Sequence, residues 1–122
     1  MQLSTDFKEM DIYTTPKSEK DNYSISFSFV ITGAGTKTLH YLMDGEEIDT
    51  EELTNTDKMA HVYKIKMNKY EPGDHIFKAY ADMEVNNMKV TSNTLTLGIM
   101  YVVEDFMVNS YILSTFNEKE TT

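Results

Sequence analysis

The sequence predicts an all-β fold, an antiparallel β-sandwich of about seven strands. Three observations lead to this prediction. Apolar and polar residues alternate with period two along several short segments, turn residues separate these segments at intervals of about 8 to 12 residues, and helical spacing of apolar residues is absent from them. We expect one domain over residues 1–104, followed by a linker or the start of a further domain over residues 105–122.

The first strands lie in the N-terminal third of the chain, with a weaker one near Asp6–Tyr13. From Asn22 to Thr32, aromatic and branched apolar residues at every second position alternate mainly with serines, which predicts a half-buried strand. Residues 37–43 repeat the pattern after a glycine-containing turn at 33–35. We expect these two strands to pair as a β-hairpin.

An acidic segment follows the turn dipeptide Asp44-Gly45. Residues 46–52 are rich in carboxylates and, with the polar residues 54–58, predict a short edge segment and a loop. Alternation returns over residues 61–67, which predicts a further strand.

The last two predicted strands, residues 75–85 and 88–103, should form a hairpin. Pro72-Gly73 marks the turn before them, and Asn86-Asn87 between them suits a primed turn because asparagine tolerates positive φ. The small side chains at Ala79 and Ala81 indicate a place where two sheets approach closely.

Two features concern the C-terminal part. Residues 101–113 offer a helical alternative, but their irregular apolar spacing and valine content favour extended chain or a linker. Residues 3–9 resemble residues 113–119, and the separation of about 110 residues is the length of one immunoglobulin-like domain. This similarity suggests that the chain ends at the opening of a following copy.

Composition narrows the class of protein. With 122 residues, of which 40% are apolar, the chain is expected to fold around one core. Its 11 basic and 20 acidic residues give a net charge of −9, which opposes binding to nucleic acid. Cysteine is absent, which excludes disulfides and thiolate metal sites. The longest apolar runs are too short for membrane insertion, and the N-terminus lacks a secretion-signal pattern.

Three segments resemble bacterial and phage immunoglobulin-like domains of the BIG type, which occur in virion and surface proteins. They are residues 38–47, where a middle strand ends in Asp-Gly, residues 70–81, where a Gly-Asp-His corner opens a strand, and the closing strand at 92–101. The resemblance covers about residues 20 to 103. The chain departs from antibody-type domains because it has no cysteine pair and no tryptophan, so Leu39 or Tyr41 would fill that space.

This resemblance implies a module of phage tails, fibres, baseplates or capsids, or of bacterial surface proteins. Our leading hypothesis is a non-enzymatic structural or adhesive module of a virion that binds other virion or surface proteins within a larger oligomeric assembly. The alternative is a carbohydrate-binding module, either in a phage receptor-binding protein that contacts host surface glycan or in a bacterial extracellular or glycan-degrading protein. A small hydrolase is a weaker alternative, since no nucleophile, base and acid form a recognisable set.

Several residues are candidates for a site. The segment 44–52 contains six carboxylates in nine residues, so calcium ligands could come from Asp44, Glu46, Glu47 and Asp49. The histidines His40, His61 and His75 lack metal-ligand spacing, and His75 should hydrogen-bond the backbone of the Pro72-Gly73 corner. No cofactor is expected.

Tyrosine is the other candidate residue type. Alternation directs four of these rings into the core: Tyr23, Tyr41, Tyr63 and Tyr101. Tyr80 lies on the opposite face of its strand from Ala79 and Ala81, where its ring could stack against a sugar.

Overall fold

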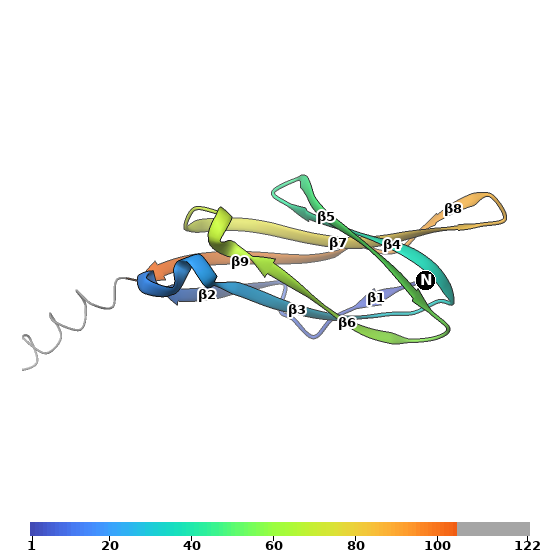
Figure 1. The fold of residues 1–122 in the computed structure, drawn as a ribbon, viewed down its shortest axis with the longest axis horizontal. Helices are drawn as coiled ribbons and strands as arrows, with labels where there is room; N and C mark the ends of the chain where they lie inside the picture. Colours follow the sequence, from blue (N-terminus) through green and yellow to red (C-terminus); the bar gives the residue numbers. More distant parts are fainter. Residues whose placement is uncertain (105–122) are drawn as a thin grey trace, which may run out of the picture.

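The computed structural model describes residues 1–104, which form two β-sheets packed face to face (Figure 1). The nine strands are β1 (Leu3–Ser4), β2 (Met10–Pro16), β3 (Ser24–Ile31), β4 (Gly35–Met43), β5 (Glu46–Asn55), β6 (Met59–Lys66), β7 (Gly73–Val85), β8 (Met88–Thr91) and β9 (Leu95–Glu104). Two short 3₁₀ helices, η1 (Lys17–Asn22) and η2 (Met67–Lys69), follow β2 and β6. The predicted all-β sandwich is confirmed, and its immunoglobulin-like type stays a prediction.

The smaller sheet has three strands in the order β1-β3-β6, and the six-stranded sheet runs β2-β9-β7-β4-β5 with β8 beside β7. Within these sheets all pairs are antiparallel except β2 with β9, which run parallel from Met10 opposite Gly98 to Pro16 opposite Glu104. The sandwich is therefore mixed at one edge, where purely antiparallel pairing was expected.

The predicted hairpin between residues 22–32 and 37–43 is wrong. The strand β3 pairs with β1 and β6, whereas β4 pairs with β5 and β7, so the two strands belong to different sheets. The connection between them contains Gly33 and Gly35, whose φ values of 95° and 115° are in the region that favours glycine. Because the chain crosses from one sheet to the other here, the apolar faces of β3 and β4 meet across the core.

Other boundaries also differ from the prediction. The acidic segment after Gly45 is not a short edge segment and loop but a ten-residue edge strand, β5. The segment 88–103 is divided into two strands, β8 and β9, and both pair antiparallel with β7. The predicted pairing of the last two segments is therefore confirmed, but the second segment is not one continuous strand. The weak N-terminal strand lies at Met10–Pro16, and neither 3₁₀ helix was predicted.

Two tight turns have the predicted chemistry. Asp44 and Gly45 have φ values of 54° and 89°, and they join Met43 to its register partner Glu46. Asn86 and Asn87, at 52° and 65°, likewise connect β7 to β8. Positive φ at both central residues is the requirement of a type I′ hairpin turn, which these residue types tolerate.

The core lies between the two sheets and is built around aromatic rings. Phe27 of β3 contacts Phe77 of β7 edge-on at a centroid distance of 5.3 Å and Phe7 at 5.0 Å. Tyr23 stacks on Tyr101 at 5.8 Å. The four tyrosines predicted to face inward are buried or packed against the core, and Ala79 and Ala81 are fully buried, as predicted.

A lysine is buried where the chain crosses between the sheets. The Lys37 side chain is fully buried, and its Nζ donates to the carbonyl oxygens of Gly33 and Gly35 and to Asn55 Oδ1. Asn55 Nδ2 in turn donates to Gly33 O at 3.0 Å. Burial lowers the pKa of Lys37 below its ordinary value. The cluster fixes the crossover connection to the end of β5.

Each edge strand of the six-stranded sheet, β2 and β5, has an aspartate whose carboxylate accepts a hydrogen bond from a backbone N–H group of the same strand. Asp11 Oδ1 accepts the Ile12 N–H on β2 at 2.8 Å, and Asp49 Oδ1 accepts the Thr50 N–H on β5 at 2.8 Å. Each bond removes a donor that another strand could use, and charged groups discourage edge-to-edge pairing. The edges are therefore less suited to binding a partner than the faces of the sheets.

Candidate functional site

An exposed group of large apolar side chains lies on the outer face of the six-stranded sheet. Met10, Ile12, Ile76 and Met100 are 70%, 65%, 50% and 38% exposed. The register places Met10, Gly98 and Ile76 in one row across β2, β9 and β7, with Ile12 and Met100 in the next row. We call these four side chains the apolar face. Outward positions of a sandwich usually carry polar residues, so such a group is typical of an interaction site.

Glycine and acidic residues shape this face. Gly98 leaves space for Met10, because a Cβ added at Gly98 would lie 3.4 Å from the Met10 Cβ and Cγ atoms. Asp74 is in register with Met100, and Asp44 binds the backbone N–H of Ile76 through Oδ1 at 2.8 Å. The apolar face therefore has carboxylates along its border.

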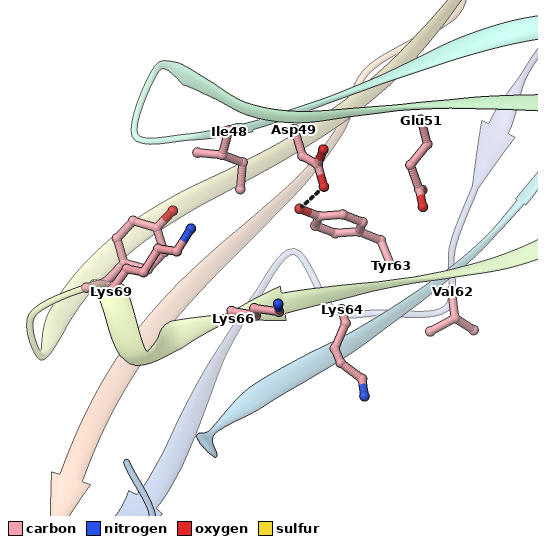
Figure 2. Close-up of a pocket in the computed structure, with 9 residues that line it drawn as sticks. Ile48, Asp49, Glu51, Val62, Tyr63, Lys64, Lys66 and Lys69 are labelled. Atoms are coloured by element: carbon pink, nitrogen blue, oxygen red, sulfur yellow. Dashed lines mark hydrogen bonds between the residues drawn. The ribbon is translucent and has the colours of Figure 1, made fainter. Parts of the chain in front are cut away.

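A second feature is a hollow of about 330 Å³ between β5 of one sheet and β6 of the other (Figure 2). Tyr63 OH donates to Asp49 Oδ2 at 3.1 Å across the gap, as Figure 2 shows. Tyr41 OH donates to Glu51 Oε1 at 2.7 Å, and His61 Nε2 lies 2.9 Å from the same oxygen. Carboxylates on the inner face of an edge strand thus connect the two sheets.

The phenol groups in this cluster remain proton donors. Burial, with the nearby carboxylates Glu51 and Asp49, raises the pKa of both Tyr41 and Tyr63 well above the ordinary value of 10. The two rings also stack at a centroid distance of 3.8 Å. The arrangement is suited to holding the sheets together and to hydrogen bonding, because these hydroxyls keep their protons near neutral pH.

The four calcium candidates are not brought together. Asp44 contacts His75, Glu47 contacts His40, and Asp49 accepts a hydrogen bond from Tyr63. Glu46 is exposed at the start of β5. Within residues 1–104, no group of three or more His, Cys, Asp and Glu side chains is placed to hold a metal ion.

The histidines also lie apart, and each contacts a different acidic side chain. His40 lies 2.7 Å from Glu47 and 2.8 Å from Asp82, and its ring stacks on Tyr80 at 4.7 Å. Tyr80 is half-buried, and His40 covers one face of its ring. Sugar stacking on Tyr80 stays a prediction.

His75 forms the predicted contact with the Pro72-Gly73 corner. Its Nε2 lies 2.6 Å from Glu71 O, and its Nδ1 lies 2.7 Å from Asp44 Oδ2. Burial alone would lower the pKa of His75, but the bonds to Asp44 and Glu71 raise it above 6.5. The pKa of Asp44 is correspondingly below 3.8, because the bonds from His75 and Ile76 outweigh its partial burial.

Sequence reasoning missed the apolar face and the buried Lys37. Side chains alternate between the two faces of a strand, so a strand over residues 10–13 with Tyr13 facing inward has Met10 and Ile12 facing outward. This pattern could have indicated that both are exposed. Nothing in the sequence showed that Met100 and Ile76 would be their neighbours, since that depends on the parallel pairing of β2 with β9.

Comparison with protein-family models, with curated proteins and with solved structures finds no match to this chain. Among residues 1–104 there is no helix of the length and apolar character that a membrane crossing requires. Residues 113–119, whose similarity to residues 3–9 suggested a following copy, and the linker predicted at 105–122 lie outside the described residues.

Proposed function

We propose that this chain is a non-enzymatic attachment module that binds a neighbouring protein through the apolar face. The observation that carries the proposal is the alignment of Met10, Ile12, Ile76 and Met100 on adjacent strands of the six-stranded sheet. Taking a fully exposed side chain of this kind to full burial yields about 1.5–3 kcal/mol, and a partner would gain the share that corresponds to the exposed 38–70% of each. On the edge strands β2 and β5, Asp11 and Asp49 accept hydrogen bonds from backbone N–H groups, which favours docking on the face over addition of a strand at an edge.

Charge favours a partner different from this chain. Asp44 and Asp74 border the apolar face, with Lys78 as a basic neighbour two residues beyond Ile76, and the whole chain carries a net charge of −9. Two copies packed through this face would bring like charges together, which disfavours the contact. The partner is therefore a protein with an apolar surface bordered by lysine or arginine.

The setting that we propose is a phage virion, in a tail, fibre, baseplate or capsid decoration, with a bacterial cell surface as the alternative. Its basis is the sequence resemblance to bacterial and phage immunoglobulin-like domains, to which a rigid sandwich with one apolar outer face is well suited.

A photo-crosslinking amino acid at position 12, introduced in the source organism, tests the proposal. We expect one discrete crosslinked product with a single partner, and we expect Met10→Lys to abolish it. The matched control places the same amino acid at Thr56, in the exposed β5–β6 loop. Products that are the same at both positions, or that persist in Met10→Lys, would contradict the proposal. Finding the product in purified particles would support the virion setting.

A further inference from the structure

Five lysines gather around η2 in a protein that is otherwise acidic. Lys64 and Lys66 come from the end of β6, and Lys69 belongs to η2. Lys17 and Lys20 belong to η1, and they line a hollow of about 260 Å³ together with Lys69. A third hollow, of about 340 Å³, is lined by Lys64 and Lys66. This one region holds five of the 11 basic residues.

The three hollows are neighbours, because they share lining residues. Lys69 and Tyr70 line both the β5–β6 hollow and the one beside η1, and Lys64 and Lys66 line the β5–β6 hollow and the third one. Figure 2 shows Lys66 and Lys69 on the η2 side of the β5–β6 hollow, opposite Ile48 and Asp49. We call the region that these neighbouring hollows form the η2 surface.

Within residues 1–104, four of the five ammonium groups have no acidic partner. Among the described residues, Lys20 is the one member of the five in an ion pair, 4.0 Å from Asp21. Four carboxylates also line the hollows, namely Asp21, Asp49, Glu51 and Glu71. Asp49 and Glu51 already accept hydrogen bonds, from the half-buried Tyr63 and the buried Tyr41. Five lysines against four carboxylates reverse the balance of the whole chain, where 20 acidic residues outnumber 11 basic ones.

The remaining groups in the β5–β6 hollow indicate the ligand chemistry. The aromatic rings of Tyr63 and Tyr70 line it, and aromatic rings bind the apolar faces of sugars. The carboxylates of Asp49 and Glu51 can accept hydrogen bonds from sugar hydroxyls. A volume of about 330 Å³ is at the lower end of ligand pockets. Nucleic acid fits less well, because its long phosphate backbone would also meet the acidic remainder of the protein.

We propose that the η2 surface binds an anionic saccharide, a sugar that carries a carboxylate or phosphate group. Lys66 and Lys69 contact the anionic group, and Tyr70 contacts the sugar ring. The η2 surface shares no residue with the apolar face, so the two proposals can fail independently.

Titration of the full chain with three sugars tests this site by calorimetry and by amide chemical shifts. The probes are a galacturonic acid trimer, its neutral methyl ester and glucose 6-phosphate. We expect saturable binding of at least one anionic sugar, with shifts at residues 63–71, and weak or no binding of the neutral ester. Binding of the galacturonic acid trimer would identify the anionic group as a carboxylate, and binding of glucose 6-phosphate would identify it as a phosphate.

Charge reversal provides the matched variants. We expect Lys66→Glu/Lys69→Glu to weaken binding about tenfold, since two favourable contacts become repulsive. Lys8→Glu/Lys58→Glu changes the net charge equally at exposed sites away from the η2 surface and should retain the affinity. Lys66→Gln/Lys69→Gln, which adds no negative charge, should give an intermediate affinity, and thermal melting checks that all three variants fold.

Three results would overturn the proposal. The first is that neither anionic sugar binds saturably. The second is that Lys8→Glu/Lys58→Glu weakens binding as much as Lys66→Glu/Lys69→Glu does. The third is that an oligodeoxythymidylate binds more tightly than both anionic sugars.

Discussion

The charge of His75 follows from what its two ring nitrogens contact. One faces the Asp44 carboxylate and the other a backbone carbonyl, so both neighbours accept hydrogen bonds. A ring protonated at both nitrogens can donate to both, whereas a neutral ring can donate to one. The Tyr70 ring lies beside it at a centroid distance of 5.5 Å. The contact between Asp44 and His75 joins the Asp44-Gly45 turn to the start of β7.

We predict that the Asp44–His75 pair stabilises the fold most between about pH 4 and 6.5. The pKa of His75 is raised above 6.5, so its contribution is complete below that pH and is lost as the pH rises through the folded-state pKa. The pKa of Asp44 is lowered below 3.8, so its contribution is lost as the pH falls through that lower value. Urea unfolding of wild type and His75→Gln across pH measures the difference.

The double variant Asp44→Asn/His75→Gln is the control for this prediction. Its free energy of unfolding should vary with pH less than that of the wild type, because both titrating groups are removed. A difference between wild type and His75→Gln that is the same at about pH 5 and pH 9 would contradict the assigned pKa shifts.

At the scale of elements, the connection from β3 to β4 depends on Lys37 and Asn55. We predict that Asn55→Ala destabilises the protein by about 2 kcal/mol, because the buried ammonium loses one of its three acceptors. Chemical denaturation measures this loss. In Lys37→Met/Asn55→Ala the loss should be smaller than the sum of the two single losses, since the charge is removed together with its acceptor. Strict additivity would show that the two side chains are not coupled.

Local patterns predicted the strands and turns, but they did not predict which strands pair. Alternation over 22–32 and 75–85 correctly placed β3 and β7, and Asp44-Gly45 and Asn86-Asn87 correctly placed two turns, because these signals depend on neighbouring residues. The predicted pairing of β3 with β4 was wrong, because pairing depends on contacts between residues distant in sequence.

The candidate site was harder to predict for a related reason. A register shift between Tyr41 and Leu42 leaves Ile48 as an extra, unpaired residue in β5. Because of this shift, Asp49 lies opposite Tyr41 and Glu51 lies opposite Leu39, and both of these β4 residues face inward. Sequence alone gave six carboxylates with no means of sorting them. The apolar face likewise depends on the parallel alignment of β2 with β9.

At the scale of the whole molecule, Phe27 joins the two sheets. Its ring is buried and contacts Phe77 of the opposite sheet. We predict that Phe27→Ala costs about 3–5 kcal/mol, because it leaves a cavity between the sheets. Urea unfolding followed by circular dichroism and by tyrosine fluorescence measures this loss.

The exposed Val62, on β6 in the same small sheet, is the matched control. Val62→Ala should change the free energy of unfolding by less than about 0.5 kcal/mol. Both probes should report one transition in each protein, since three strands alone would leave their apolar face uncovered. Separate transitions for the two sheets would contradict a shared core.

The parallel alignment of β2 and β9 also determines how the domain would respond to tension. Residue 1 lies toward one end of the long axis and β9 ends at the other (Figure 1). Pulling these two points apart first loads the two β1–β3 register pairs and then draws β2 and β9 in opposite directions along their common axis. All seven register pairs from Met10–Gly98 to Pro16–Glu104 would then be loaded together in shear, not opened one after another. Such a module resists extension best along the line that joins its ends.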